Sequence, residues 1–332
     1  MRILVRDRDL QRFRGELEAG LAGHEVRWAD PAGSGGLTGV DVFVGPRFTR
    51  DDAASADVLR LVQVAGAGLD GIDLAAVPGR AACANLFRHE ASIAEYVATA
   101  AAFLRRGIGA QDAALRTDTW LRPSGGNDRP LPSGLASARI GLVGFGHIGR
   151  SCWTLFRAFG ARTGCAVSRA GAAGRDTAGL AWWGELNDVD RLCRESDVVV
   201  VSLPDADRTR ALIGAAQLGL VGPDGVLVNV GRGPVVEPQA LYDALSGRTL
   251  GAAAIDVWYH YPAGDEPCRP ADQDFGRLDN VLMTPHSSGV TRETYRARIA
   301  DIVDNVARVG AGRAPRNEVR APALRQPGPD DR

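Results

Sequence analysis

Short apolar runs alternate with longer amphipathic stretches along most of this 332-residue chain, and that alternation restricts the folds open to it. Continuous runs of branched apolar residues are typical of strands buried on both faces, as in parallel sheets. The longer stretches suit the helices that must connect parallel strands. The pattern therefore predicts an α/β protein with doubly wound parallel sheets.

The same pattern gives the expected elements. The strands are Ile3–Val5, Glu25–Trp28, Val42–Val44, Leu61–Val64, Ile140–Val143, Cys165–Val167, Val198–Val201, Val226–Val230 and Ala252–Ile255. The helices are Ser92–Arg106, the stretch after Gly146 to Phe159, Pro238–Ser246 and Arg292–Gly310.

The chain is long enough for two domains. The segment Arg116–Gly134 is polar and rich in Gly, Pro and Ser, which predicts an exposed connection before a new series of strands and helices. We expect one domain to comprise residues 1–98 with 288–332, because the final segment is mostly one long helix and too small for a core of its own. Residues 99–287 form the second. The tail after Asn317 is expected to be loosely ordered.

Composition excludes several classes of function. The chain has 39 basic and 40 acidic residues, and all of the basic ones are arginine. Because there is no lysine, lysine Schiff bases, lysine general bases and the P-loop lysine are ruled out. The balanced charge offers no footprint for nucleic acid. No apolar run reaches the length of a bilayer span, so we expect no membrane partner and a cytoplasmic location. Five widely spaced cysteines predict free core thiols, and no metal site is expected.

A glycine-rich turn follows the predicted strand Ile140–Val143. It reads Gly144-Phe-Gly146-His-Ile-Gly149 and leads into an amphipathic helix. In this context the first glycine permits a tight turn, the second lets the backbone approach a pyrophosphate, and the third allows close packing of helix and strand. The helix N-terminus would then hold the anion. The turn predicts a dinucleotide site.

The end of the next strand indicates which dinucleotide is preferred. An acidic residue there would accept hydrogen bonds from the ribose 2′-hydroxyl, but the strand is followed by Ser168 and Arg169. Both can bind a 2′-phosphate, Arg169 with charge-assisted hydrogen bonds. NADP is therefore favoured over NAD.

Two residues at strand ends are candidates for chemistry. His286 follows an apolar run and a proline, and Arg232 follows the strand Val226–Val230. The carboxyl ends of strands are where doubly wound folds bind ligands, and an arginine there can grip a carboxylate with two hydrogen bonds.

Several motifs in register give the chain a resemblance to the D-isomer-specific 2-hydroxyacid dehydrogenase family. They are the segment from Val64 to Asp73, Ser92–Val97, the glycine turn, Ser196–Pro204, Asn229–Gly233, Asp256-Val-Trp and Thr284-Pro-His286. The resemblance implies two Rossmann-like or flavodoxin-like domains, with the first and last segments forming the substrate domain. It also implies an active site in the interdomain cleft, a homodimer, and NAD(P)-dependent interconversion of small 2-oxo acids and D-2-hydroxy acids.

The resemblance also assigns roles to individual residues. The backbone of Ala67 and Gly68 would bind the substrate carboxylate, with Arg232 binding it and polarising the carbonyl. His286 would be the acid or base, and Asp256 would hold the carboxamide of the cofactor. The matching segments place further residues at the cofactor: His147, Ile148, Leu203, Pro204, Val230, Gly231 and Gly289.

The chain departs from the family at one important position. Most members have a glutamate that pairs with the catalytic histidine, whereas this sequence has Tyr261. Without an adjacent anion an imidazole titrates near its ordinary pKa of about 6.5, or lower when desolvated. We therefore expect carbonyl reduction to fail at a lower pH than in relatives with the glutamate, unless Asp265 or Glu266 folds back to take its place.

Three further residues are predicted to face the substrate. Arg47 and Arg88 follow strands of the first domain, and His89 lies beside Arg88. If both arginines face inward, the substrate carries a second anionic group such as a carboxylate, phosphate or phosphonate.

Two alternatives stay open at this point. Formate dehydrogenases, a branch of the family, need no proton transfer, and the chain shares their Asp-Val-Trp opening, so proton-independent oxidation of formate, phosphite or a phosphonate is one. The other is a non-catalytic dinucleotide sensor on the same scaffold.

Overall fold

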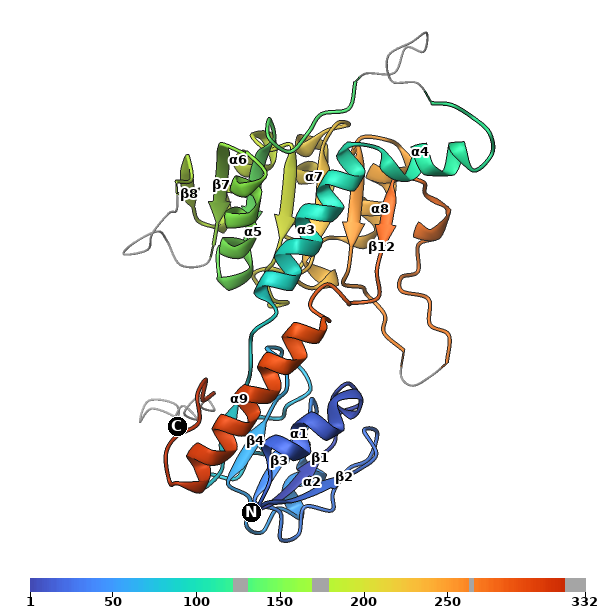
Figure 1. The fold of residues 1–332 in the computed structure, drawn as a ribbon. Coiled ribbons are helices and arrows are strands. Elements are labelled where there is room, and N and C mark those ends of the chain that lie inside the picture. Colours follow the sequence, from blue (N-terminus) through green and yellow to red (C-terminus); the bar gives the residue numbers. More distant parts are fainter. Residues whose placement is uncertain (122–130, 169–178, 263–265, 320–332) are drawn as a thin grey trace, which may run out of the picture. The chain divides into compact units, whose positions relative to one another are not determined.

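The computed structural model describes residues 1–121, 131–168, 179–262 and 266–319. The chain forms two compact units, one of Met1–Arg88 with Thr291–Arg332 (unit 1) and one of His89–Val290 (unit 2). Each contains one parallel sheet with helices against it (Figure 1). The predicted α/β fold class is confirmed.

Unit 1 has a five-stranded sheet in the order β2-β1-β3-β4-β5. Its strands are β1 (Arg2–Val5), β2 (Glu25–Trp28), β3 (Val42–Val44), β4 (Leu61–Gln63) and β5 (Ala82–Ala84). Its helices are α1 (Arg14–Gly20), α2 (Arg50–Ala54) and α9 (Arg292–Gly310). Helix α9 follows unit 2 in the sequence but packs on unit 1. Its apolar stripe explains this, because Ile299, Ile302 and Val306 pack with the strand residues Ile3 and Val5.

Unit 2 has a seven-stranded sheet in the order β12-β11-β10-β9-β6-β7-β8. Its strands are β6 (Arg139–Val143), β7 (Thr163–Val167), β8 (Trp182–Gly184), β9 (Val198–Val201), β10 (Val226–Asn229), β11 (Ala252–Ile255) and β12 (Val281–Met283). Its helices are α3 (Glu90–Arg105), α4 (Ile108–Leu115), α5 (His147–Ala158), α6 (Val189–Arg194), α7 (Ala215–Val221) and α8 (Pro238–Ser246).

The run of four valines in β9 shows why the apolar strands do not alternate with polar residues. Val198 and Val200 pack in the core cluster with α3 and α5, while Val199 and Val201 pack in the cluster with α6, α7 and α8. Because successive side chains point to opposite faces, a strand covered by helices on both sides must be apolar throughout. This double covering positions the strand ends that carry the candidate site.

Every predicted strand is present, with ends within two residues of those expected. The sequence-based division at residue 98 falls inside α3, which packs against α5, β10 and β11 of unit 2. Four cysteines are buried as expected, but Cys268 is exposed, which corrects the prediction that all five are core thiols. The predicted tail beyond residue 319 lies outside the described residues.

Two further observations concern expected absences. Among the described helices, none has the length and apolar character needed to cross a bilayer. Within the same part of the chain, no three His, Cys, Asp or Glu side chains gather closely enough to hold a metal ion.

Candidate functional site

The glycine turn joins β6 to α5 and leaves open space above the helix N-terminus. Gly144 has a φ of 104°, in the left-handed region that favours glycine. A Cβ at Gly149 would strike the carbonyl oxygen of Gly144, so helix and turn pack too closely for any side chain. A Cβ at Gly146 would meet nothing within 4 Å. The local shape therefore fits a pyrophosphate that approaches the backbone at Gly146.

The ribose-recognition position lies at the end of β7. Ser168 is 8% exposed, and its hydroxyl accepts a hydrogen bond of 3.1 Å from Trp183 Nε1. The Trp183 ring also packs edge-on against Phe145 of the glycine turn, with centroids 5.3 Å apart. Arg169 lies outside the described residues.

Arg232, Asp256 and His286 follow three neighbouring strands. The register pairs Asn229 of β10 with Ile255 of β11, and Ile255 with Met283 of β12, all parallel. Because parallel strands end at one edge of a sheet, the three residues belong to the same edge of unit 2. That edge is where a doubly wound sheet binds its ligands.

The Arg232 turn is held by Asn229. The Asn229 side chain accepts from Gly231 N at 3.1 Å and donates to the Arg232 carbonyl at 3.2 Å. A Cβ at Gly231 would strike the backbone of Leu203, so only glycine allows the turn to lie this close to the preceding loop. The predicted cofactor residues Leu203, Val230 and Gly231 are buried here, while Pro204 is exposed.

Asp256 organises the loop that carries His286. Its carboxylate is fully buried and accepts from Thr284 Oγ1 at 2.6 Å, Ser287 N at 2.8 Å, Ser288 N at 3.0 Å and the Ser288 hydroxyl. Four donors occupy the four lone-pair positions of a carboxylate. His286 lies between these anchors with a φ of 57°, a strained conformation for histidine. Tyr96 of α3 extends the network, because its hydroxyl lies 2.8 Å from Thr284 Oγ1.

Tyr261 contacts the candidate catalytic histidine directly. Its hydroxyl lies 3.1 Å from His286 Nδ1 and accepts from Trp258 N at 3.1 Å. Trp258 in turn donates from its ring nitrogen to the Thr284 carbonyl at 2.8 Å. Of the two carboxylates considered as substitutes, Glu266 is exposed and Asp265 lies outside the described residues.

Sequence reasoning missed most of these supporting residues. Tyr96, Trp258 and Thr284 fall within the quoted motifs but were given no role, and Ser287 and Ser288 were not named. A signal was present, because Thr284 and the two serines flank His286, and short hydroxyl side chains often bind a buried carboxylate.

The loop after β4 in unit 1 has the features of an anion site. Within the described residues, the N–H groups of Ala67 and Gly68 donate to no protein acceptor. The segment after β5 holds this loop in place, because Asn85 Nδ2 donates to the Ala67 carbonyl at 2.9 Å and Leu86 N donates to the Gly66 carbonyl at 2.9 Å. Unpaired backbone N–H groups on a fixed loop suit a carboxylate.

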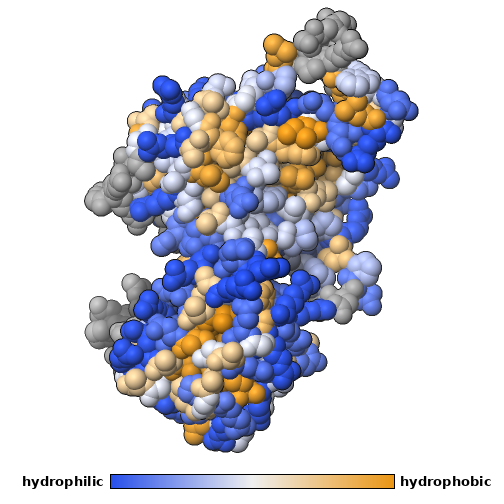
Figure 2. All heavy atoms as spheres, in the orientation of Figure 1, coloured by the Kyte–Doolittle hydropathy of each residue, from blue (hydrophilic) through white to orange (hydrophobic). Residues whose placement is uncertain are grey.

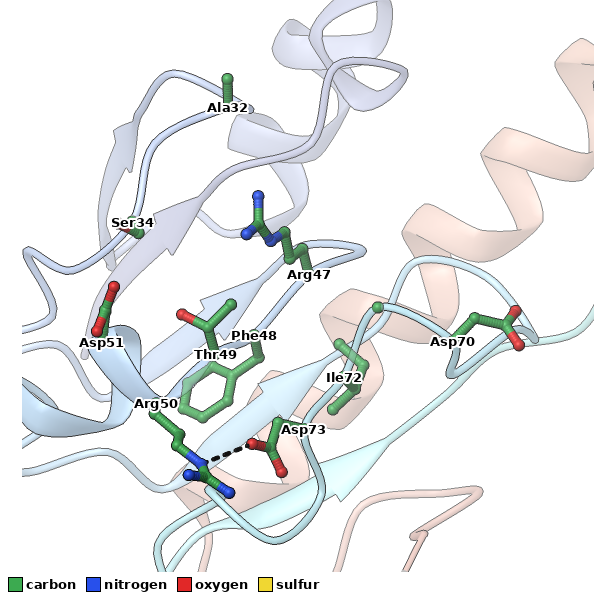
Figure 3. Close-up of a pocket in the computed structure, with 11 residues that line it drawn as sticks. Ala32, Ser34, Arg47, Phe48, Thr49, Arg50, Asp51, Asp70, Ile72 and Asp73 are labelled. Atoms are coloured by element: carbon green, nitrogen blue, oxygen red, sulfur yellow. Dashed lines mark hydrogen bonds and ion pairs between the residues drawn. The ribbon is translucent and has the colours of Figure 1, made fainter. Parts of the chain in front are cut away.

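A pocket of about 580 Å³ lies at the carboxyl edge of the unit 1 sheet, between the loops after β2, β3 and β4 (Figure 3). Arg47 extends into it, is exposed, and makes no hydrogen bond or ion pair with the described residues. Its neighbour Arg50 pairs with Asp73 at 3.3 Å. The loops after β3 and β4 pack in direct contact, because a Cβ at Gly71 would strike the Pro46 carbonyl oxygen.

The other predicted substrate residues are engaged within the protein. Arg88 makes two hydrogen bonds to Asp301 of α9, at 2.8 and 3.0 Å. His89 is 9% exposed at the start of α3, and a Cβ at Gly289 would lie 3.1 Å from its Cβ. His147 is exposed and Ile148 is half-buried at the first turn of α5.

Comparison with known proteins adds independent information. Residues 98–288 match the family model described as D-isomer specific 2-hydroxyacid dehydrogenase, NAD binding domain. The chain is 28% identical over 293 residues to D-3-phosphoglycerate dehydrogenase of Methanocaldococcus jannaschii, covering 86% of this chain and 53% of that one. It is 40% identical over 138 residues to glyoxylate/hydroxypyruvate reductase B of Enterobacter agglomerans, and that match covers 42% of this chain and 41% of the reductase.

The fold likeness extends over nearly the whole chain. A crystal structure of D-lactate dehydrogenase with NAD⁺ from Lactobacillus jensenii superposes with a TM-score of 0.81 at 22% identity, covering 97% of this chain and 100% of the other. By contrast, the chain spans about half the length of the phosphoglycerate dehydrogenases that it matches.

Proposed function

This chain belongs to the D-isomer-specific 2-hydroxyacid dehydrogenase family, and from that premise we propose that it is a nicotinamide-dependent oxidoreductase. In this proposal it reduces a small 2-oxo acid to a D-2-hydroxy acid, or catalyses the reverse. The observation that carries the proposal is the position of Arg232, Asp256 and His286 after three adjacent parallel strands of one sheet.

Each side chain has a role suited to its chemistry. Arg232 binds the substrate carboxylate and polarises the carbonyl with its guanidinium. His286 gives a proton to the developing alkoxide, or takes it in the reverse direction. Because Nδ1 faces Tyr261, we assign the contact with substrate to Nε2. By the family resemblance, we assign the backbone N–H groups of Ala67 and Gly68 to the substrate carboxylate as well.

The glycine turn would hold the cofactor through its pyrophosphate at Gly146 and the N-terminus of α5. When bound, the nicotinamide supplies or accepts the hydride. We propose NADP as the preferred form, because no acidic side chain follows β7 and Ser168 and Arg169 suit a 2′-phosphate. Arg169→Ala should then weaken NADPH affinity by about tenfold or more and leave NADH affinity unchanged. Equal losses for both cofactors would contradict the preference.

We further propose that Arg47 selects substrates with a second anionic group at the end remote from the carbonyl. The support is its guanidinium in the unit 1 pocket, which pairs with none of the described residues, whereas Arg88 already pairs with Asp301. Arg47→Gln should lower kcat/KM for dianionic 2-oxo acids about tenfold or more and leave pyruvate-like substrates unchanged. Arg50→Gln is the matched control. A wild-type preference for monoanionic substrates would overturn the assignment.

A spectrophotometric screen tests the proposed activity. NADPH and NADH consumption would be followed with 2-oxo acids of graded size and charge, with formate and phosphite added in the oxidative direction. Turnover that is lost in Arg232→Ala and in His286→Ala supports the enzyme. Cofactor binding without any turnover would instead support the sensor.

We also propose a homodimer. The support is a set of large apolar side chains left exposed in α4 and in the chain that follows it: Ile108 at 46%, Leu115 at 49%, Trp120 at 73% and Leu131 at 71%. None of the eight residues of α4 is buried. Figure 2 shows further hydrophobic residues, in orange, on the face of unit 2 that carries α3 and α5.

A further inference from the structure

The Tyr261 hydroxyl is held in place from two sides. Trp258 N donates to it at 3.1 Å, and His286 Nδ1 lies 3.1 Å away. Trp258 is itself fixed, because it is 5% exposed and its ring nitrogen donates to the Thr284 carbonyl at 2.8 Å. The same tryptophan therefore ties down both the tyrosine and the loop that carries the histidine.

We infer that Tyr261 is a positioning residue that holds His286 through a neutral hydrogen bond able to serve both protonation states of the ring. This inference rests on the proposed function for its catalytic consequence. The pairing itself is open to measurement in the protein without substrate or cofactor.

The count of donors and acceptors supports this reading. A phenolic hydroxyl has one O–H and two lone pairs. The Trp258 N–H donates to this oxygen, and a hydroxyl that accepts one hydrogen bond can both donate and accept at the His286 Nδ1 contact. A charged imidazole can donate its Nδ1–H to the phenolic oxygen, and a neutral imidazole can accept from the O–H. A carboxylate at this position could only accept, and would favour the charged ring.

The described groups around the loop include a carboxylate, a phenol and a cation. Asp256 lies beneath the loop, but its oxygens are occupied by the donors of Thr284, Ser287 and Ser288. From α3, Tyr96 approaches through Thr284, and burial raises the pKa of its hydroxyl to about 12, so it stays neutral. Arg232 places a cation on the same sheet edge, and its Nη1 donates to the Gly231 carbonyl at 2.8 Å.

The position also tolerates substitution. The Tyr261 side chain is 49% exposed, and its ring centroid lies 5.7 Å from that of His286. Removing the hydroxyl therefore leaves the core intact. Tyr261→Phe isolates the hydrogen bond, and Tyr261→Glu replaces it with a carboxylate. Tyr242→Phe, which removes a tyrosine hydroxyl from α8, is the matched control.

The first measurement is ¹⁵N NMR of the His286 ring in the ligand-free protein, assigned by its loss in His286→Ala. We expect Tyr261→Phe to move the Nδ1 resonance and Tyr242→Phe to leave it in place. We expect Tyr261→Glu to raise the imidazole pKa by about one unit or more, because an adjacent anion favours the charged ring. An Nδ1 resonance and titration identical in wild type and Tyr261→Phe would overturn the inference, whether or not a substrate is found.

The second measurement is kinetic. Tyr261→Phe should lower kcat by about 2- to 12-fold with little change in KM, the range for loss of one hydrogen bond. Tyr261→Glu should extend carbonyl reduction to higher pH, because the ring keeps its proton longer. Unchanged kcat in Tyr261→Phe together with an unchanged pH profile in Tyr261→Glu would contradict a positioning role. Failure to find any 2-oxo acid substrate would count against the proposed function and leave the NMR result standing.

Discussion

Asp256 is a residue whose position in the chain suggests one role and whose contacts support another. The family resemblance assigns it to the cofactor carboxamide, yet its four lone-pair positions are filled by the loop around His286. A contact with a carboxamide would have to displace one of these donors. At the scale of single residues, we therefore propose that its main effect is to fix the strained backbone of the histidine.

Asp256→Asn separates the two roles. The amide places a donor against groups that already donate, so we expect unfolding free energy to fall by about 1–3 kcal/mol and kcat to fall with it. The dissociation constant for NADPH should change little. Fluorescence titration and urea unfolding check both quantities. A large loss of NADPH affinity at unchanged stability would instead support a direct contact with the cofactor.

At the scale of elements, the glycines of the turn before α5 separate cofactor binding from folding. Gly146→Ala adds a methyl group where the protein leaves space, so we expect a normal thermal midpoint and an affinity for the dinucleotide reduced on the order of tenfold. Gly149→Ala forces a methyl group against the Gly144 carbonyl and should lower the midpoint itself. Calorimetry and cofactor titration of both variants test this, and equal melting behaviour would refute the distinction.

In unit 1, a buried ion pair joins Arg6, which directly follows β1, to Asp52 of α2. Arg6 Nη1 donates to Asp52 Oδ1 at 2.6 Å, with the two side chains 5% and 1% exposed. Burial alone would raise the Asp52 pKa, but hydrogen bonds from Arg6, Thr49 and Gly35 outweigh it and lower the pKa. A carboxyl with a lowered pKa stabilises the folded state above its unfolded pKa of 3.8, and that contribution is lost as the pH falls through the folded value.

Asp52→Asn should therefore destabilise the protein by about 3–5 kcal/mol near neutral pH, because it leaves the Arg6 guanidinium buried without a counter-charge. The deficit should shrink as the pH falls below about 4, because the unfolded wild-type chain then binds a proton at Asp52 that the folded carboxylate binds only at its lower pKa. Urea unfolding across this range measures it. Exposed Asp51→Asn is the control, and a deficit of the same size at every pH would contradict the linkage.

The sequence predicted the elements with a strong local signal and missed those without one. The valine run of β9 and the glycine turn are unambiguous, whereas β5 is Ala-Cys-Ala and has too few apolar atoms to stand out. At the site, Arg232 and His286 were predictable because strand ends can be counted. The saturation of Asp256 and the Tyr261 contact depend on loops more than 20 residues apart, which no local pattern encodes.

For the whole molecule, the exposed apolar residues around α4 lead to a prediction about assembly. Light scattering after size exclusion should give twice the chain mass of 35.1 kDa. Ile108→Asp combined with Leu115→Asp should shift the mass to that of a single chain without lowering the thermal midpoint of unit 2, because both side chains are exposed. A wild type that elutes as a monomer at micromolar concentration would remove the support for the homodimer.

The placement of Trp183 has a practical consequence. Its indole N–H binds Ser168 and its ring touches Phe145, so one fluorophore borders both the adenosine side and the phosphate side of the proposed dinucleotide site. The chain thus carries a native optical probe, whose emission is expected to change when NADPH arrives. This change in emission would report cofactor binding without labels and without turnover. Trp183→Phe should remove it.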